Sequence, residues 1–325
     1  MKAIVLESPG DPSALQLREI AKPYPRSGWV LIQVKAFGLN RSEMFTRQGY
    51  SPNVQLPRIL GIECVGIVEV APDTPFQPGQ TVAAIMGGMG RAFDGSYAEY
   101  TCVPQACVFP IQSTLDWSVL GAIPEMFQTA YGSLISGLAV QAGQTLLIRG
   151  GTSSVGMAAA HLAKDLGLTV MATTRNPAKV NALKANGVDR VVIDDGAIAT
   201  TIRQSVPNGV DRVLELVGTT TLIDSLQCAT PGGIVCMTGI LGNAWSLPDF
   251  SPMAQIPHTV KLTVYTGGTE DLAVEHLQRF IAGVEAGQSR VNIDRVFRLD
   301  EIVAAHHYME SNQATGKLVV AVNAP

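Results

Sequence analysis

Cysteine is scarce in this chain of 325 residues, and no two cysteines form a CxxC pair. The five positions are Cys64, Cys102, Cys107, Cys228 and Cys236. An odd number of widely spaced cysteines argues against a disulfide framework and is typical of a reduced, intracellular setting. We therefore expect a cytoplasmic protein.

Long apolar runs and clusters of positive charge are also missing. The apolar stretch near the N-terminus ends at Glu7, too early for a signal peptide, and no run reaches the roughly 18 apolar residues of a membrane span. The formal net charge is −4 without any run of Lys or Arg, which argues against nucleic-acid and anionic-membrane partners. Hydrophobic residues make up 46% of the chain and charged residues 15%, as expected for a globular protein with a large core.

Residues 1–120 are predicted to be rich in β structure. Runs of β-branched and apolar residues at Trp29–Ala36 and Cys64–Val70 are bounded by Gly and Pro. A Pro-Gly turn leads into Thr81–Ala84, and Ser96–Val103 continues the pattern. This organisation is typical of a small, twisted, barrel-like domain.

From Pro124 onward, helices and strands are predicted to alternate. The expected strands are Gln144–Arg149, Leu168–Thr174, Val191–Ile193, Asp211–Val217, Gly233–Thr238 and Lys261–Tyr265. The expected helices are Pro124–Val140, Val155–Leu166, Pro177–Asn186, Ala197–Ser205, Thr220–Ala229 and Asp271–Ala286. Such alternation indicates an α/β fold with a parallel sheet covered on both faces. The tail, Lys317–Val322, is expected to be a strand that returns to the first domain.

The turn after the strand Gln144–Arg149 is a candidate dinucleotide phosphate site. It contains Gly151, Thr152, Ser153, Ser154, Val155 and Gly156 and precedes a predicted helix. N–H groups at a helix N-terminus can bind phosphate, and glycines let the backbone approach it. Because Ser153 replaces the middle glycine of a strict GxGxxG, the turn alone also fits an ordinary loop. The alternating context favours the cofactor site.

The end of the second strand predicts the choice of cofactor. An NAD enzyme usually has an acid about 20 residues past the first glycine, but no acid lies between Asp165 and Asp189. Thr174 and Arg175 end the strand instead, and Lys179 follows. A guanidinium and a second positive charge suit a 2′-phosphate, so we expect NADPH. The alternative is a pair of solvated cations at the start of a surface helix.

Six segments, in order, resemble the medium-chain dehydrogenase/reductase superfamily. They are Gly38–Glu43, Leu60–Gly66, Gly95–Tyr100, Thr129–Tyr131, Gly150–Gly156 and Gly316–Val320. The resemblance implies a GroES-like β-barrel domain, residues 1–122 and 269–325, and a Rossmann dinucleotide-binding domain, residues 123–268. It also implies a dimer or tetramer, and we expect a homodimer formed through the strand Lys261–Tyr265. We expect the cofactor site to include Thr129, Val217, Gly239 and Leu241.

The metal ligands of the zinc-dependent relatives are not matched here. Those relatives have a Cys where this chain has Asn40, a His where it has Ile62, and a third ligand near Glu125. The four-Cys structural lobe is also absent. Catalytic zinc needs about three protein ligands, so we expect a metal-free member. The resemblance then points to the quinone-reductase-like branch, whose members reduce quinones or conjugated enones.

The expected function is therefore hydride transfer from NADPH to a small apolar quinone or enone. Asn40 and Tyr50 are the candidate catalytic residues, although Asn40 also fits a turn and Tyr50 an exposed loop aromatic. Glu125, at a helix start, is typical of a partner for the helix dipole. Two alternatives stay open: an enoyl-thioester reductase of the same fold, which would need a basic groove for CoA phosphates, and a non-enzymatic NADPH-binding protein.

Overall fold

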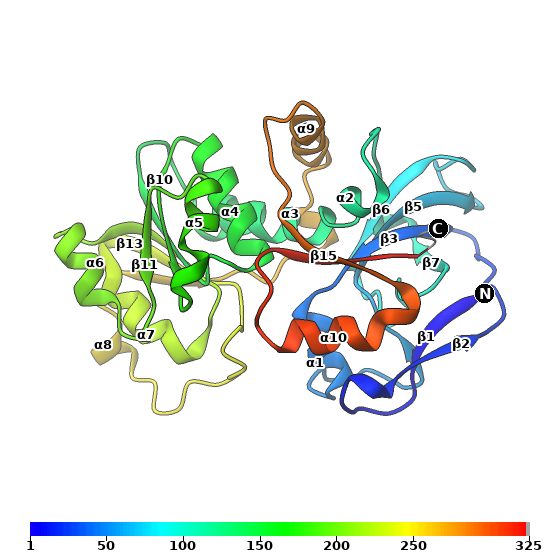
Figure 1. Ribbon diagram of the computed structural model, residues 1–325, viewed down its shortest axis with the longest axis horizontal. Helices are drawn as coiled ribbons and strands as arrows, with labels where there is room; N and C mark the ends of the chain where they lie inside the picture. Colours follow the sequence, from blue (N-terminus) through cyan, green and yellow to red (C-terminus); the bar gives the residue numbers. More distant parts are fainter. Residues whose placement is uncertain (323–325) are drawn as a thin grey trace. The chain divides into compact units, whose positions relative to one another are not determined.

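The computed structural model describes residues 1–322, which form two compact units (Figure 1). The first unit contains Met1–Glu125 together with the chain from Gly268 onward, and the second contains Met126–Gly267. The last positions of the first predicted domain, 323–325, lie outside the described residues.

The first unit is built on two sheets. The smaller has the order β2-β1-β4 and consists of β1 (Lys2–Leu6), β2 (Leu15–Glu19) and β4 (Arg58–Ile59). The larger has the order β15-β16-β3-β5-β6-β8, and β7 pairs with β3. Its strands are β3 (Trp29–Gly38), β5 (Glu63–Val70), β6 (Thr81–Ile85), β7 (Tyr100–Pro104), β8 (Val108–Pro110), β15 (Ile293–Arg298) and β16 (Lys317–Ala321). The predicted β-rich domain is confirmed, and the tail strand β16 joins it, with Val319 opposite Gly38.

Short helices connect these strands. They are α1 (Arg41–Arg47), α2 (Trp117–Leu120), α9 (Val274–Glu285) and α10 (Ile302–Glu310), while α3 (Pro124–Gly132) spans the boundary between the units. Helix α9 begins at Val274 rather than at Asp271, because Thr269–Asp271 forms a 3-10 turn. The Asp271 carboxylate accepts a hydrogen bond from the Gly268 backbone N–H and so stabilises that turn (3.2 Å).

The second unit holds a parallel sheet of six strands in the order β11-β10-β9-β12-β13-β14. The strands are β9 (Thr145–Arg149), β10 (Thr169–Thr174), β11 (Arg190–Ile193), β12 (Val210–Glu215), β13 (Ala229–Met237) and β14 (Lys261–Val264). The helices are α4 (Ser154–Asp165), α5 (Val180–Ala185), α6 (Ala199–Ser205), α7 (Thr219–Cys228) and α8 (Pro252–Gln255). The predicted alternation, and with it the α/β class, is confirmed.

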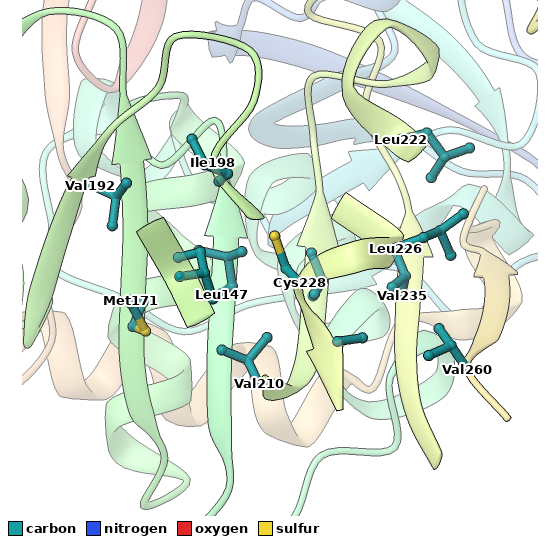
Figure 2. Close-up of a cluster of buried hydrophobic side chains, with 13 residues drawn as sticks. Leu147, Met171, Val192, Ile198, Val210, Leu222, Leu226, Cys228, Val235 and Val260 are labelled. Carbon is teal, nitrogen blue, oxygen red and sulfur yellow. The ribbon is translucent and has the colours of Figure 1, made fainter. Parts of the chain in front are cut away.

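One face of this sheet carries the apolar cluster drawn in Figure 2. The cluster includes Leu147, Met171 and Val235 from three strands, together with Leu222 and Leu226 of α7. Fully burying a side chain of this kind contributes about 1.5–3 kcal/mol, so the cluster holds the helices on the sheet. The carboxyl ends of the strands in this sheet are therefore fixed relative to one another.

The predicted helix Pro124–Val140 is shorter than expected. Regular α-helix ends at Gly132, and Ser133–Gly137 continues as a π-helical turn. The Ser133 hydroxyl donates to the Thr129 carbonyl (2.6 Å), which draws that oxygen away from a regular helical pattern. Within residues 1–322, none of the helices combines the length and the apolar character that a membrane crossing needs.

Candidate cofactor and reaction sites

The Gly-rich turn joins β9 to the N-terminus of α4. Ser153 is the N-cap residue: its hydroxyl accepts a hydrogen bond from the Gly156 N–H (3.1 Å) and donates to the Gly150 carbonyl (2.8 Å). Serine is among the best N-cap residues, which explains why it can replace the middle glycine of the fingerprint. Thr152, Ser154 and Val155 are half-buried, so an anion can reach the first turn of α4.

The last glycine of the turn is required by close packing. A Cβ at Gly156 would lie 2.6 Å from the Gly150 carbonyl oxygen and 2.8 Å from that of Gly151. Only glycine therefore lets α4 start so close to the end of β9. The Gly151 N–H in turn donates to the Thr173 carbonyl, which ties the turn to β10 (3.0 Å).

The loops that follow β9, β12 and β13 meet at the same edge of the sheet. The Leu216 N–H donates to the Arg149 carbonyl (3.0 Å), and the Leu241 N–H donates to the Leu216 carbonyl (3.1 Å). Val217 and Gly239 lie beside these bonds in the chain. The structure thus brings the predicted residues Val217, Gly239 and Leu241 together with the Gly-rich turn at the carboxyl edge of a parallel sheet, where ligands of such folds bind.

Thr129 lies near this edge as well. Its carbonyl accepts the hydrogen bond from Ser133, whose hydroxyl is 2.9 Å from that of Thr238, one residue before Gly239. Thr129 itself is half-buried. The sequence-predicted threonine therefore belongs to the same group of residues.

A buried ion-pair network, which the sequence analysis missed, anchors the residue before the turn. Arg149 is fully buried and donates to Asp194 through Nε and Nη2 (2.9 Å each) and to Asp224 through Nη1 (2.7 Å). Burial opposes the charge on Arg149, but the hydrogen bonds and charge of Asp194 raise its pKa above the ordinary value. The network fixes the end of β9, so the turn starts from a rigid point.

Arg175 follows β10 and is exposed. The turn behind it is ordered by Thr174, whose hydroxyl accepts from the Asn176 N–H (3.2 Å), and by Asn176, whose side chain accepts from the Ala178 N–H (3.0 Å). Lys179 ends this 3-10 turn and is half-buried. Both predicted cations thus follow β10, the neighbour of the strand β9 that leads into the Gly-rich turn.

The acids that follow these cations most closely in the chain are engaged elsewhere. Asp189 precedes β11, at the opposite end of the parallel strands, and pairs with Lys164 (2.8 Å). Asp194, which follows β11, is held by Arg149. Neither Asp189 nor Asp194 is therefore positioned like the acid that binds a ribose 2′-hydroxyl in NAD enzymes.

The first unit contains a buried polar cluster around Asn40. The Asn40 Nδ2 group donates to Glu63 Oε1 (3.0 Å) and to Glu43 Oε1 (3.3 Å), and its Oδ1 accepts from Lys317 Nζ (2.5 Å). Lys317 also contacts Glu63 Oε1 (2.7 Å) and Glu125 Oε2 (3.2 Å). Glu63 Oε2 accepts from the Glu125 backbone N–H (2.8 Å). Each of these groups lies in the first unit, and each is buried.

Burial and charge shift the acid–base properties of this cluster. Burial raises the pKa of Glu43 to about 8, and the neighbouring Glu63 carboxylate adds to that shift. Burial opposes the charge of Lys317, but Glu63 and Glu125 raise its pKa above the ordinary value. At neutral pH the lysine is therefore charged and Glu43 is mostly protonated.

The two predicted catalytic residues differ in their surroundings. Both N–H bonds of the Asn40 amide point to carboxyl groups, so only the second lone pair of its Oδ1 is available for other partners. Tyr50 follows α1, where its N–H donates to the Phe45 carbonyl (2.9 Å), and the residue is 63% exposed. The Tyr50 hydroxyl is thus accessible, whereas Asn40 is held within the cluster.

Comparisons with known proteins agree with this architecture. Residues 26–113 match the family described as alcohol dehydrogenase GroES-like domain, and residues 186–320 match the family described as zinc-binding dehydrogenase. Human quinone oxidoreductase is 28% identical over 327 residues, covering 98% of this chain and 97% of the relative. The structure of the quinone oxidoreductase from Coxiella burnetii is similar with a TM-score of 0.85 and 26% identity, covering 99% of each chain.

A third similarity concerns the fold alone. The structure of Escherichia coli quinone oxidoreductase complexed with NADPH has a TM-score of 0.89 at 18% identity, covering 99% of this chain and 100% of the other. The two units are thus a GroES-like domain and a Rossmann-like domain, as the resemblance implied. The two family matches and the similarity to quinone oxidoreductases support a quinone oxidoreductase-like member of the medium-chain dehydrogenase/reductase superfamily.

The zinc site of other superfamily members does not fit the residues present here. Ile62 carries no ligand atom, and the Lys317 ammonium lies within hydrogen-bond distance of both Asn40 and Glu125. Among residues 1–322, no group of three or more His, Cys, Asp or Glu side chains is arranged to hold a metal ion.

Proposed function

We propose that this protein is an NADPH-dependent reductase that transfers hydride to small apolar quinones or conjugated enones. The observation that carries the proposal is the carboxyl edge of the Rossmann-like sheet, where Arg175 and Lys179 follow β10 and a capped helix N-terminus follows the neighbouring strand β9. The similar quinone oxidoreductase structure with NADPH, and the family membership of the chain, support it.

The cofactor residues have distinct parts in this proposal. The N-terminus of α4 and the turn from Gly151 to Gly156 bind the pyrophosphate through backbone N–H groups. Arg175 and Lys179 bind the 2′-phosphate by charge-assisted hydrogen bonds. Thr129, Val217, Gly239 and Leu241 line the remainder of the site. When bound, NADPH supplies the hydride.

The proposed substrate follows from what the reaction can do without a Lewis acid. Reduction of a simple ketone by hydride benefits from a metal that polarises its oxygen. A quinone or enone delocalises the developing negative charge over its conjugated system. It needs mainly correct placement and a proton donor near the oxygen. In this proposal Tyr50 or solvent supplies that proton, and Asn40 lies in the reaction pocket.

The proposed assembly is a homodimer, working in the cytoplasm. Strand β14 is at the edge of the six-stranded sheet, and Val264 on it is 67% exposed. An exposed edge strand with an apolar side chain favours association, and pairing with its copy in a second chain would cover it. The five cysteines are free, in keeping with a reduced compartment.

A substrate screen tests the proposed function. Purified protein is mixed with NADPH and, separately, with a naphthoquinone, a small enone and an enoyl-CoA, and NADPH absorbance is followed. We expect oxidation of NADPH with the quinone and the enone. Turnover of enoyl-CoA alone would favour an enoyl-thioester reductase, and NADPH binding without turnover of any of the three would favour a non-enzymatic role.

A further inference from the structure

A single ammonium group lies at the centre of the buried polar cluster in the first unit. Lys317 Nζ donates to Asn40 Oδ1 (2.5 Å), Glu63 Oε1 (2.7 Å) and Glu125 Oε2 (3.2 Å). An ammonium has three N–H donors and no acceptor, so these oxygens account for its full donor capacity. The Lys317 side chain is 0% exposed. Three protein oxygens thus surround one positive charge that water does not reach.

The positive charge of Lys317 balances the negative charge of the carboxylates in the cluster. Glu63 is fully buried and Glu125 nearly so, and both direct a carboxylate oxygen at Lys317. A buried carboxylate that loses its partner keeps its desolvation penalty without the compensating attraction. Without the ammonium, two acidic groups and an amide oxygen would face the same point with no positive charge between them.

The backbone is shaped to admit the lysine. Lys317 opens β16, which lies beside β3, and Val319 is paired with Gly38. A Cβ at Gly38 would lie 2.3 Å from Lys317 Cε and 2.4 Å from Glu63 Oε1. Position 38 therefore has to be glycine for the ammonium to reach its three oxygens.

The composition of the cage matches that of a site for a hard cation. Carboxylate and amide carbonyl oxygens are the ligands preferred by Mg²⁺, Ca²⁺ and Mn²⁺, whereas zinc sites use Cys and His more often. The resemblance to zinc-dependent relatives also implies a metal ligand at the position of Asn40 and another near Glu125. The same region of the fold thus holds a positive charge, but here the charge belongs to a side chain.

We propose that the cluster is a cation site whose cation is supplied by the chain itself. The Lys317 ammonium takes the place of a metal ion among Asn40, Glu63 and Glu125, and it closes the site to metals from solution. When the lysine is shortened, the cage accepts a hard divalent cation or a small alkylammonium ion.

The test uses full-length Lys317→Ala with Mn²⁺ and ethylammonium as probes. Mn²⁺ binding is measured by loss of the free-ion signal in electron paramagnetic resonance. We expect the variant to bind one Mn²⁺ about 100-fold more tightly than the wild-type chain, in which the ammonium competes for the same oxygens. Ethylammonium chloride should displace the bound Mn²⁺ and raise the melting temperature of the variant only.

Two controls tie the binding to this cage. Lys2→Ala removes an exposed lysine from β1 of the same unit and should behave as the wild type. Adding Glu63→Gln to Lys317→Ala should abolish the gain in Mn²⁺ affinity, because one anionic ligand is lost.

Lys317→Met keeps the length of the stem and removes only the charge. It should melt below the wild type and bind no Mn²⁺, since its side chain still fills the cage. The proposal is overturned if folded Lys317→Ala takes up no Mn²⁺ and is not stabilised by ethylammonium. It is equally overturned if Lys317→Met melts at the wild-type temperature, because the cage would then need no cation.

Discussion

The guanidinium of Arg149 and the carboxylate of Asp194 form a two-pronged ion pair, with Nε–Oδ2 and Nη2–Oδ1 distances of 2.9 Å. The arginine ends β9 and the aspartate follows β11, with β10 between the two strands. The pair therefore spans three strands at the edge that carries the Gly-rich turn. This rigid link holds that edge in shape before any ligand arrives.

Loss of Asp194 should destabilise the protein strongly. Asp194→Ala leaves the fully buried Arg149 without its main partner, and breaking a buried pair in this way typically costs about 3–5 kcal/mol. We expect a large fall in melting temperature by calorimetry. Asp195→Ala, at the exposed neighbouring position, is the matched control and should change stability little. Equal losses in the two variants would show that the ion pair adds nothing.

The stability of the protein should depend on pH through Glu43. Its folded-state pKa is about 8 against an ordinary 4.5, so between these values the folded chain holds a proton that the unfolded chain has released. The favourable contribution of Glu43 is complete below pH 4.5 and is lost as the pH rises toward 8, by about 1.4 kcal/mol per pH unit. Urea unfolding of Glu43→Gln should show a flatter pH dependence over this window.

Glu19→Gln, at an exposed strand position, provides the comparison for Glu43→Gln. It should retain the wild-type slope. If Glu43→Gln and the wild type show parallel stability curves from pH 5 to 8, then Glu43 does not hold its proton in the folded state.

Sequence patterns predicted the secondary structure of both units because apolar spacing and Gly or Pro breaks are local signals. The ends of helices were predicted less accurately. The helix that begins at Pro124 stops at Gly132, where the hydrogen bond from the Ser133 hydroxyl to the Thr129 carbonyl alters the helical hydrogen-bond pattern. The buried charges were missed because each depends on partners far away in the chain. A signal was present, however, since Arg149, Glu63 and Lys317 each occupy the end of a mostly apolar strand. Only the sheet topology shows which opposite charge each one meets.

Removal of Arg175 should change the preference between cofactors. One charge-assisted pairing with the 2′-phosphate contributes about 1.5–3 kcal/mol, so Arg175→Ala should weaken NADPH binding roughly 10- to 150-fold. NADH binding should stay nearly unchanged, because NADH lacks that phosphate. Fluorescence titration gives both dissociation constants. Arg190→Ala removes an exposed arginine at the start of β11 and should alter neither dissociation constant. An equal loss of affinity for both cofactors in Arg175→Ala would rule out phosphate recognition by Arg175.

A charge on the free edge of β14 should disrupt the proposed dimer. In a pair of β14 strands related by two-fold symmetry, Val264→Asp would bring like charges close together and remove apolar contact. Light scattering should give twice the chain mass of 34.4 kDa for the wild type and the single-chain mass for the variant. Val296→Asp places the same charge at a 45% exposed position on β15, the edge of the other large sheet, and should leave the dimer intact. A wild-type mass near that of one chain would contradict the dimer.

The hydroxyl of Tyr50 should matter more for enones than for quinones. Tyr50 is 63% exposed, which leaves it accessible to a substrate. Where a general acid is needed, it contributes about 10²–10⁴-fold to the rate. A reduced quinone already delocalises its charge and needs little help, whereas an enolate gains more from a nearby donor. Tyr50→Phe should therefore lower kcat with an enone much more than with a naphthoquinone, while the dissociation constant for NADPH stays the same. Tyr24→Phe, at another exposed tyrosine, controls for general effects of losing a surface hydroxyl. If Tyr50→Phe changes neither rate, the proton comes from solvent and Tyr50 contributes only its ring.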